Sequence, residues 1–363
     1  MATSVKSRRT QWPTTSSSAR DVKKGEFKAE PGPILYLKVP QKELPKPAHK
    51  IAPKAWIEEI RDLADGKADG KVGGDVLIFV HGYNNDPKVI RDRQLQLGKD
   101  LAAEQWRGVV VSFDWPSADS TLNYLEDRKD AARVSQELVA SGIRPLAANQ
   151  ATGCQTNVHL VGHSTGAYVI MGAFAQSEKD GKLFKQDWRI AQTAFIGGDV
   201  GVGSVAEDSE WAAPMFKRVM RLTNYQNPFD HVLAASNAKR LGVSPRVGRT
   251  GLPSNPHPKS TNVNCGEYFS KLDPKKQTFF GTFAHSWHIG NRVLHATSRW
   301  LSKDASIATR FRRARRWGRN SCCRISRGPH TTRPRRWSNR PSEVSGGDGW
   351  NRTTDLRVMN PPL

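Results

Sequence analysis

The 363-residue sequence contains little cysteine and no long apolar run. Its four cysteines, Cys154, Cys265, Cys322 and Cys323, have neither metal-ligand nor disulfide-framework spacing. No apolar run approaches the ~18 to 20 residues of a membrane-spanning helix. The basic N-terminus is followed by no apolar segment of a secretory signal. These absences argue against a disulfide scaffold and predict a soluble, cytoplasmic protein with no metal and no other cofactor.

Lysine is missing from the last part of the chain. Residues 311–363 contain 13 Arg, no Lys and 3 acidic residues, a net charge of +10, whereas residues 1–310 carry +12. Such an Arg-rich segment without periodicity is typical of GC-rich DNA read out of frame. Residues 350–363 can also be back-translated to the complement of a tRNA T-arm. Our hypothesis is that residues 311–363 form a disordered tail of frameshift or read-through origin, and that the native protein ends near Arg310.

The rest of the chain divides by composition. Residues 1–30 are rich in Ser, Thr and Lys and poor in apolar side chains. Such a segment buries too little apolar surface to offset the entropy lost on ordering, so we predict a disordered basic arm. Residues 31–310 are long enough for a sizeable core, and we assign them to one domain.

Two patterns alternate within this domain. Continuous apolar runs are typical of strands buried on both faces of a parallel sheet, and apolar residues at every third or fourth position are typical of helices. Their alternation predicts an α/β fold, with a doubly wound, mainly parallel sheet and helices on both faces. The expected strands are 34–39, bracketed by prolines and so at an edge, 75–80, 108–113, 158–161, 190–196, 217–223 and one within 261–269; the expected helices are 56–64, 87–104, 121–146, 165–176 and 287–301.

Residues 162–166 read Gly-His-Ser-Thr-Gly and lie between an apolar run and a helical pattern. This arrangement matches the nucleophile elbow of α/β hydrolases, a sharp strand-to-helix turn that exposes the serine. Glycines two positions before and after the serine leave room where strand and helix crowd together. Ser164 is therefore the candidate nucleophile.

A serine nucleophile needs a base and an acid that orients the base, and α/β hydrolases place them in the order Ser, Asp or Glu, His. Asp230 is favoured as the acid because it follows the second expected strand after the elbow, although it also suits a helix N-cap. Asp199, after the first of those strands, is the alternative acid or a turn residue. His285 is favoured as the base because it follows the last strand, and His288 is the alternate.

The developing oxyanion needs backbone donors. In α/β hydrolases one donor is the N–H of the residue after the nucleophile, and the other comes from the loop after an earlier strand. The sequence therefore predicts the N–H groups of Thr165 and Tyr83, whatever the side chain at either position.

Several motifs follow one another along the chain: His-Gly-Tyr-Asn-Asn at 81–85, Phe-Asp-Trp-Pro-Ser at 113–117, Tyr124 followed by Asp-Arg at 127–128, Gly-His-Ser-Thr-Gly at 162–166, Asn-Pro-Phe-Asp at 227–230 with Arg-Leu-Gly at 240–242, and His-Ser-Trp at 285–287. In this order they resemble the landmarks of a bacterial α/β-hydrolase family of unknown function within the esterase/lipase superfamily. The resemblance covers roughly residues 72–305 and implies a Ser164, Asp230 and His285 triad. The sequence departs from the family pattern at Asp114, where serine is common, at Thr165, where methionine is frequent, and in the turn at residues 197–199.

These patterns predict a serine hydrolase that cleaves a small-molecule carboxylic ester through an acyl-enzyme. The net charge of +22 suggests binding to nucleic acid or another anionic surface as an alternative. Such binding would need basic residues along one recognition element with stacking aromatics, whereas the excess charge here is scattered or lies in the tail. A catalytically inactive hydrolase fold used for binding is a further alternative, and the complete set of triad candidates argues against it.

Overall fold

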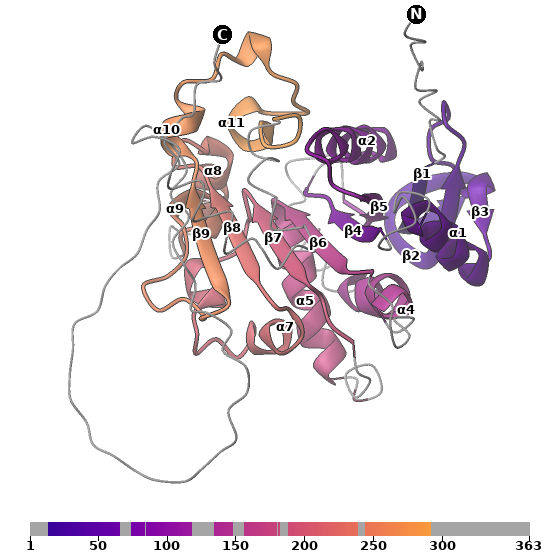
Figure 1. Cartoon of the computed structure of the whole chain (residues 1–363), viewed down its shortest axis with the longest axis horizontal. Helices are drawn as coiled ribbons and strands as arrows, with labels where there is room; N and C mark the ends of the chain where they lie inside the picture. Colours follow the sequence, from indigo (N-terminus) through magenta and orange to yellow (C-terminus); the bar gives the residue numbers. More distant parts are fainter. Residues whose placement is uncertain are drawn as a thin grey trace, which may run out of the picture.

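Figure 1 shows a computed structural model of the chain, which describes residues 14–65, 74–83, 85–117, 134–147, 156–179, 181, 188–238 and 244–291. The strands are β1 Thr14–Lys23, β2 Glu26–Val39, β3 Lys50–Ile51, β4 Asp75–Val80, β5 Gly108–Asp114, β6 Val158–His163, β7 Gln192–Ile196, β8 Leu222–Gln226 and β9 Ser260–Asn264. The helices are α1 Pro53–Asp65, α2 Pro87–Ala103, α4 Arg144–Ala147, α5 Thr165–Lys179, α7 Ala213–Arg218, α8 His231–Ala238, α9 Val247–Thr250, α10 Gly266–Phe269 and α11 Phe283–Ser286. Single turns are η1 Pro47–His49, η2 Leu138–Ile143, which is π-helical, η3 Val202–Val205 and η4 Pro274–Lys276.

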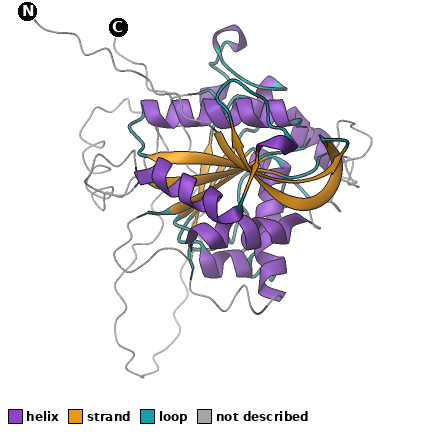
Figure 2. Ribbon diagram, turned by 90° about the vertical axis from the view of Figure 1, so that its right-hand side faces the viewer, coloured by secondary structure: helices purple, strands orange, loops and turns teal. Residues whose placement is uncertain are grey.

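The described strands form one sheet in the order β3-β2-β1-β5-β4-β6-β7-β8-β9. Along the part of the sheet ordered β1-β5-β4-β6-β7-β8-β9, every pair of neighbouring strands is parallel. β2 is antiparallel to both β1 and β3. Helices cover both faces (Figure 2). The predicted α/β hydrolase fold with a mainly parallel, doubly wound sheet is therefore confirmed.

The centre of the sheet explains where a site can form. The chain runs from β4 to β5 on one side and then returns to β6 on the other side of β4. In open α/β sheets, a crevice opens outside the carboxyl ends of the strands at such a reversal. The carboxyl ends of β4 and β6 carry residues 81–85 and the predicted elbow.

The core consists of two hydrophobic layers, one on each face of the sheet. Val76, Ile78 and Val80 of β4 belong to one layer, and Leu77 and Phe79 belong to the other. Successive side chains of a strand point to opposite faces, so a strand covered on both faces needs the continuous apolar run seen in the sequence. This packing fixes the strand ends that carry the site.

The predicted disordered arm is wrong from Thr14 onward. β1 lies between β2 and β5, where residues 16–18 pair with 112–114 of β5 and residues 14–18 pair with 35–39 of β2. Trp56 Nε1 donates to Ser16 O at 2.9 Å, and Gln94 Nε2 donates to Thr15 O at 2.9 Å. Neighbouring strands and helices thus bury a polar strand and satisfy its hydrogen bonds. Residues 1–13 lie outside the described part of the chain.

Other predicted elements differ in their bounds or neighbours. Residues 34–39 are part of β2, which is second from the edge because β3 lies outside it. The expected strand 217–223 divides between the end of α7 and the start of β8, since a short apolar run suits either structure. The expected strand within 261–269 is β9 followed by α10.

Two expected helices are described only in part. The helix expected at 121–146 is described from residue 134 and includes the π-helical turn η2. Of the helix expected at 287–301, the described residues 287–291 are not helical, and residues 292–363 lie outside the description. The assignments of the domain end near 310 and of the tail therefore stay predictions.

Within the described ranges, no helix is long and apolar enough to cross a membrane. No group of three or more His, Cys, Asp or Glu side chains there is placed to hold a metal ion.

Candidate active site

Ser164 occupies a strained turn between β6 and α5. Its φ of 55° lies in the left-handed region, a conformation that costs a non-glycine residue about 1–3 kcal/mol and tends to occur at functional sites. A Cβ at Gly162 would lie 2.7 Å from Ala167 N, and one at Gly166 would lie 2.1 Å from Val80 O. Both glycines are therefore required by close backbone packing, as the elbow motif predicts.

Asp230 and His285 are in direct contact. His285 Nδ1 and Asp230 Oδ2 are 2.6 Å apart, and both residues are buried. The second carboxylate oxygen, Oδ1, accepts a hydrogen bond from Leu233 N at 3.0 Å at the start of α8. The two interpretations of Asp230, orienting acid and helix cap, are therefore compatible, because each uses a different oxygen.

Ser164 and the Asp230–His285 pair meet at the end of β7. Ser164 N donates to Ile196 O at 3.1 Å. A Cβ on the next residue, Gly197, would lie 3.5 Å from His285 Cε1 and 3.6 Å from Asp230 Oδ2. Ser164 Oγ itself makes no hydrogen bond to any described residue. Catalytic hydrogen bonds are often long without substrate and shorten when it binds.

The alternate acid and base have other surroundings. Asp199 Oδ1 lies 3.3 Å from Arg246 Nε in a buried ion pair and accepts a hydrogen bond from Ser236 Oγ at 2.9 Å. The ring of His288 is fully buried, 4.3 Å from the ring centroid of Trp287. The contact between Asp230 and His285 makes these two residues the better candidates.

The two predicted oxyanion donors flank Ser164. Thr165 is the first residue of α5, so its N–H is one of the free donors of a helix N-terminus. Tyr83 follows Gly82, where an added Cβ would lie 2.7 Å from Ser164 Cβ. The loop after β4 therefore packs directly on the nucleophile, and only glycine fits at position 82. The role of Gly82 was not evident from the sequence, and Asn84 lies outside the described residues.

Arg93 and His163 form a bridge behind the nucleophile that the sequence did not indicate. Arg93 Nη1 donates to His163 Nδ1 at 3.5 Å, and Nη2 donates to Phe280 O at 2.6 Å. His163 Nε2 lies 3.1 Å from His285 O. The bridge thus links α2 and the elbow to the loop that carries His285. Its partners are 70 to 187 positions apart in the chain, so no local pattern reveals it.

Burial determines the charge of this bridge. It lowers the pKa of Arg93 to about 10. Burial, together with the nearby charge of Arg93, lowers the pKa of His163 well below its usual value. Burial also lowers the pKa of His81. Both histidines are therefore neutral at pH 7, whereas Arg93 keeps its charge.

We expect these buried histidines to make the protein less stable in acid. Below about pH 6.5 the unfolded chain protonates both side chains, and the folded chain does not until its lower pKa values are reached. The free energy of unfolding is therefore unaffected above pH 6.5 and falls as pH drops, by ~1.4 kcal/mol per pH unit and histidine. Urea unfolding, followed by tryptophan fluorescence at pH 5.5 and 7.5, measures this slope.

The variant His163→Asn should show a smaller difference between the two pH values than the wild type. The variant His231→Asn changes an exposed residue of α8 and should keep the wild-type difference. Equal pH dependence in wild type and His163→Asn would contradict the assignment of a neutral, buried ring.

Comparison with known families assigns the fold. Residues 62–266 match a family described as alpha/beta hydrolase of unknown function, DUF900. The match spans more than half of the chain and includes Ser164 and Asp230, whereas His285 follows it. No curated protein matches the sequence.

Solved structures with a similar fold include several hydrolases. A metagenomic carboxyl esterase is 11% identical, covers 63% of this chain and 75% of its own, and has a TM-score of 0.30. A candidate cell surface hydrolase from Lactobacillus plantarum is 13% identical over 53% of this chain and 82% of its own, with a TM-score of 0.27. A cutinase from Trichoderma reesei is 16% identical over 40% of this chain and 66% of its own, with a TM-score of 0.21.

Proposed function

Because the chain belongs to the DUF900 family of α/β hydrolases, we propose that it is a serine hydrolase that cleaves a carboxylic ester through an acyl-enzyme. The observation that carries this proposal is the 2.6 Å contact between His285 Nδ1 and Asp230 Oδ2, at the strand ends where Ser164 is held. A protein that only binds ligands has no need for a buried carboxylate oriented on an imidazole beside a strained serine.

The reaction follows from the roles of these side chains. Ser164 Oγ attacks the ester carbonyl carbon while its proton passes to His285 Nε2, and Asp230 stabilises the resulting imidazolium through Nδ1–H. The imidazolium gives the proton to the alkoxide oxygen, which leaves as the alcohol. Water then attacks the acyl-enzyme with His285 as base, and the carboxylic acid leaves from Ser164.

The N–H groups of Thr165 and Tyr83 would hold the carbonyl oxygen as it becomes negative. Loss of one such donor typically costs about 10²-fold to 10³-fold in rate. The neighbouring His163 does not compete with His285 as a base, because burial keeps its pKa low and its Nδ1 faces the Arg93 guanidinium.

A fluorophosphonate probe tests the nucleophile. We expect the probe to label the wild type at Ser164 and to leave Ser164→Ala unlabelled, because only an activated serine attacks the phosphorus atom. Ser177→Ala is a matched control, since Ser177 lies on the same helix and its hydroxyl donates to Ala173 O. Mass spectrometry of the labelled peptide identifies the site. Labelling that survives in Ser164→Ala would refute the assignment.

A series of p-nitrophenyl esters with increasing acyl length tests the ester part of the proposal. Turnover of at least one member, lost in Ser164→Ala, is expected. A wild type that the probe labels but that hydrolyses none of these esters would contradict the ester substrate and would leave the nucleophile assignment intact. We also propose that the substrate is a small-molecule ester and that the protein is located in the cytoplasm.

A further inference from the structure

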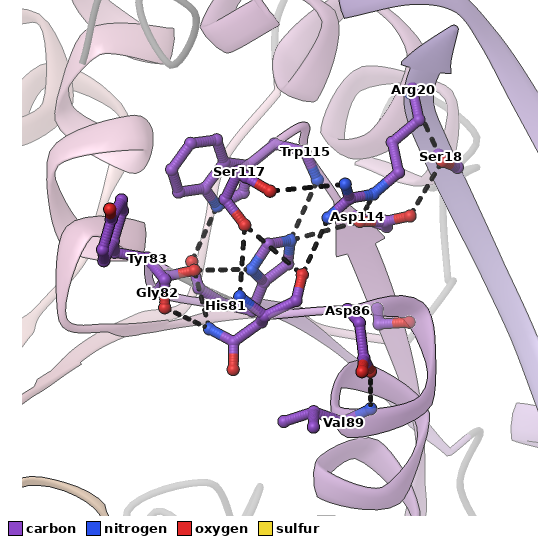
Figure 3. Close-up of polar contacts among 12 residues, drawn as sticks. Ser18, Arg20, His81, Gly82, Tyr83, Asp86, Val89, Asp114, Trp115 and Ser117 are labelled. Carbon is purple, nitrogen blue, oxygen red and sulfur yellow. Dashed lines mark hydrogen bonds and ion pairs between the residues drawn. The ribbon is translucent and has the colours of Figure 1, made fainter. Parts of the chain in front are cut away.

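A cluster of buried polar side chains lies beside the elbow and has no role in the triad. We call it the loop cluster, and it comprises Arg20, His81, Asn85, Asp114 and Ser117, each at most 5% exposed. Figure 3 shows Arg20, His81, Asp114 and Ser117 gathered around the loop that follows β4. Taking an ion pair such as Arg20 and Asp114 out of water is costly, so its position next to a functional loop needs an explanation.

The loop cluster fixes one peptide group. Gly82 O accepts a hydrogen bond from His81 Nδ1 at 2.7 Å and another from Asn85 Nδ2 at 2.8 Å. Asn85 Nδ2 also donates to Tyr83 O at 2.8 Å. A planar trans peptide directs its N–H opposite to its C=O, so two hydrogen bonds on Gly82 O set the direction of Tyr83 N–H. This N–H is the proposed oxyanion donor.

The proton of His81 is assigned from its neighbours. Trp115 N donates to His81 Nε2 at 3.1 Å, so the proton of the neutral ring is on Nδ1 and points at Gly82 O. The His81 and Trp115 rings stack with centroids 5.3 Å apart, and Trp115 Nε1 donates to His81 O at 2.7 Å. The indole therefore holds the imidazole in the orientation that the loop requires.

Arg20 holds the other side of the same loop. Its guanidinium donates through Nε to Asp114 Oδ1 at 2.8 Å, through Nη2 to Asn85 O at 2.8 Å and through Nη1 to Ser117 O at 3.5 Å. Asp114 Oδ1 is also 3.3 Å from His81 Nε2, and Asp114 Oδ2 accepts a hydrogen bond from Ser18 Oγ at 2.9 Å. One side chain of β1 thus joins the loops after β4 and β5.

We propose that Arg20 is a positioning residue for the oxyanion hole. Asp114 orients its guanidinium, which holds Asn85 so that Tyr83 N–H faces the carbonyl oxygen bound at Ser164. This inference rests on the proposed function. It makes the hairpin of β1 and β2 part of the catalytic apparatus, although that hairpin contributes none of the proposed triad or oxyanion residues.

The test compares a double variant with the wild type. Arg20→Gln/Asp114→Asn removes both charges, so it leaves no lone charge buried. We expect kcat for p-nitrophenyl acetate to fall about 10-fold to 100-fold while KM changes less than about 3-fold, because a displaced donor weakens transition-state binding more than substrate binding. Rates are divided by the fraction of molecules that the fluorophosphonate probe titrates, so that misfolded protein does not count.

Two further variants separate positioning from stability. Arg20→Lys keeps the charge but cannot reach three acceptors with one ammonium group, so its normalised kcat should also fall. Asp75→Asn removes a buried carboxylate at the opposite end of β4, where Asp75 Oδ2 lies 3.2 Å from His159 Nε2. This control should lower the melting temperature and leave the normalised kcat unchanged.

Hydrogen exchange reports on the loop directly. In the double variant, peptides that contain residues 81–85 should exchange faster than in the wild type, whereas peptides from α5 should not. If the wild type is active and the double variant has an unchanged normalised kcat, the positioning role of Arg20 is overturned and the proposed function stands. A wild type that neither hydrolyses esters nor reacts with the probe would overturn the proposed function, and this inference with it.

Discussion

Ser164→Ala and His285→Ala are each expected to lower kcat for p-nitrophenyl acetate by at least about 10⁴-fold. Without the serine no acyl-enzyme forms, and without the imidazole nothing accepts the proton of Ser164 Oγ. Because the two side chains act as one unit, the double variant should be about as slow as the slower single variant. Stopped assays at high enzyme concentration measure these rates. For each protein that the fluorophosphonate probe still labels, the probe also gives the fraction of active molecules.

His288→Asn provides the matched control, because His288 is the neighbouring histidine and the alternate base. It lies in the same loop region and is fully buried, so its replacement tests whether general disturbance of this region reduces activity. We expect the melting temperature to fall and the normalised kcat to stay within about 10-fold of the wild type, within the range of an indirect effect. A larger loss in His288→Asn than in His285→Ala would reverse the two assignments.

The residues of the candidate site could be predicted because a local motif marks the nucleophile and the order along the chain indicates the acid and the base. The elbow at 162–166 specifies its own turn, and the two glycines are there because a Cβ at either position would collide with backbone. The rule that acid and base follow the nucleophile at strand ends selected Asp230 and His285, which the structure brings to 2.6 Å.

The part of the fold that composition could not predict is the N-terminal hairpin. Patterns of apolar residues indicate which segments bury themselves, whereas β1 is buried by neighbours on both sides and has a polar sequence, Thr-Thr-Ser-Ser-Ser. The partners that stabilise this buried polar strand are distant in the chain; Asp114, for example, is 94 residues from Arg20. A composition-based prediction of disorder fails where long-range hydrogen bonds replace apolar contacts.

The same limit explains why supporting residues were missed while motif residues were found. Arg93 lies in an ordinary helical pattern, and Asp114 is the last residue of a mostly apolar strand, a common place for a polar residue. Their importance depends on the atoms that they contact in the folded protein, such as Phe280 O for Arg93. Those contacts form only once the strands have assembled into the complete sheet.

The variant Asp230→Asn is expected to lower kcat by about 10³-fold to 10⁴-fold with little loss of stability. The asparagine oxygen can still accept the hydrogen bond from Leu233 N that caps α8. Its amide group would then face His285 Nδ1 as a donor, so the ring must carry its proton on Nε2. In that tautomer His285 cannot accept the proton of Ser164 Oγ, and the normalised kcat measures the loss.

The matched variant Asp199→Asn should show the opposite behaviour. It removes one partner of the buried pair with Arg246 and leaves the guanidinium without its counter-charge. Breaking a buried pair in this way typically costs about 3–5 kcal/mol, so the urea midpoint should fall while the folded molecules retain their turnover rate. Loss of turnover in Asp199→Asn combined with normal turnover in Asp230→Asn would transfer the acid role to Asp199. Since each variant changes one carboxylate to its amide, the pair separates orientation of the base from stability of the fold.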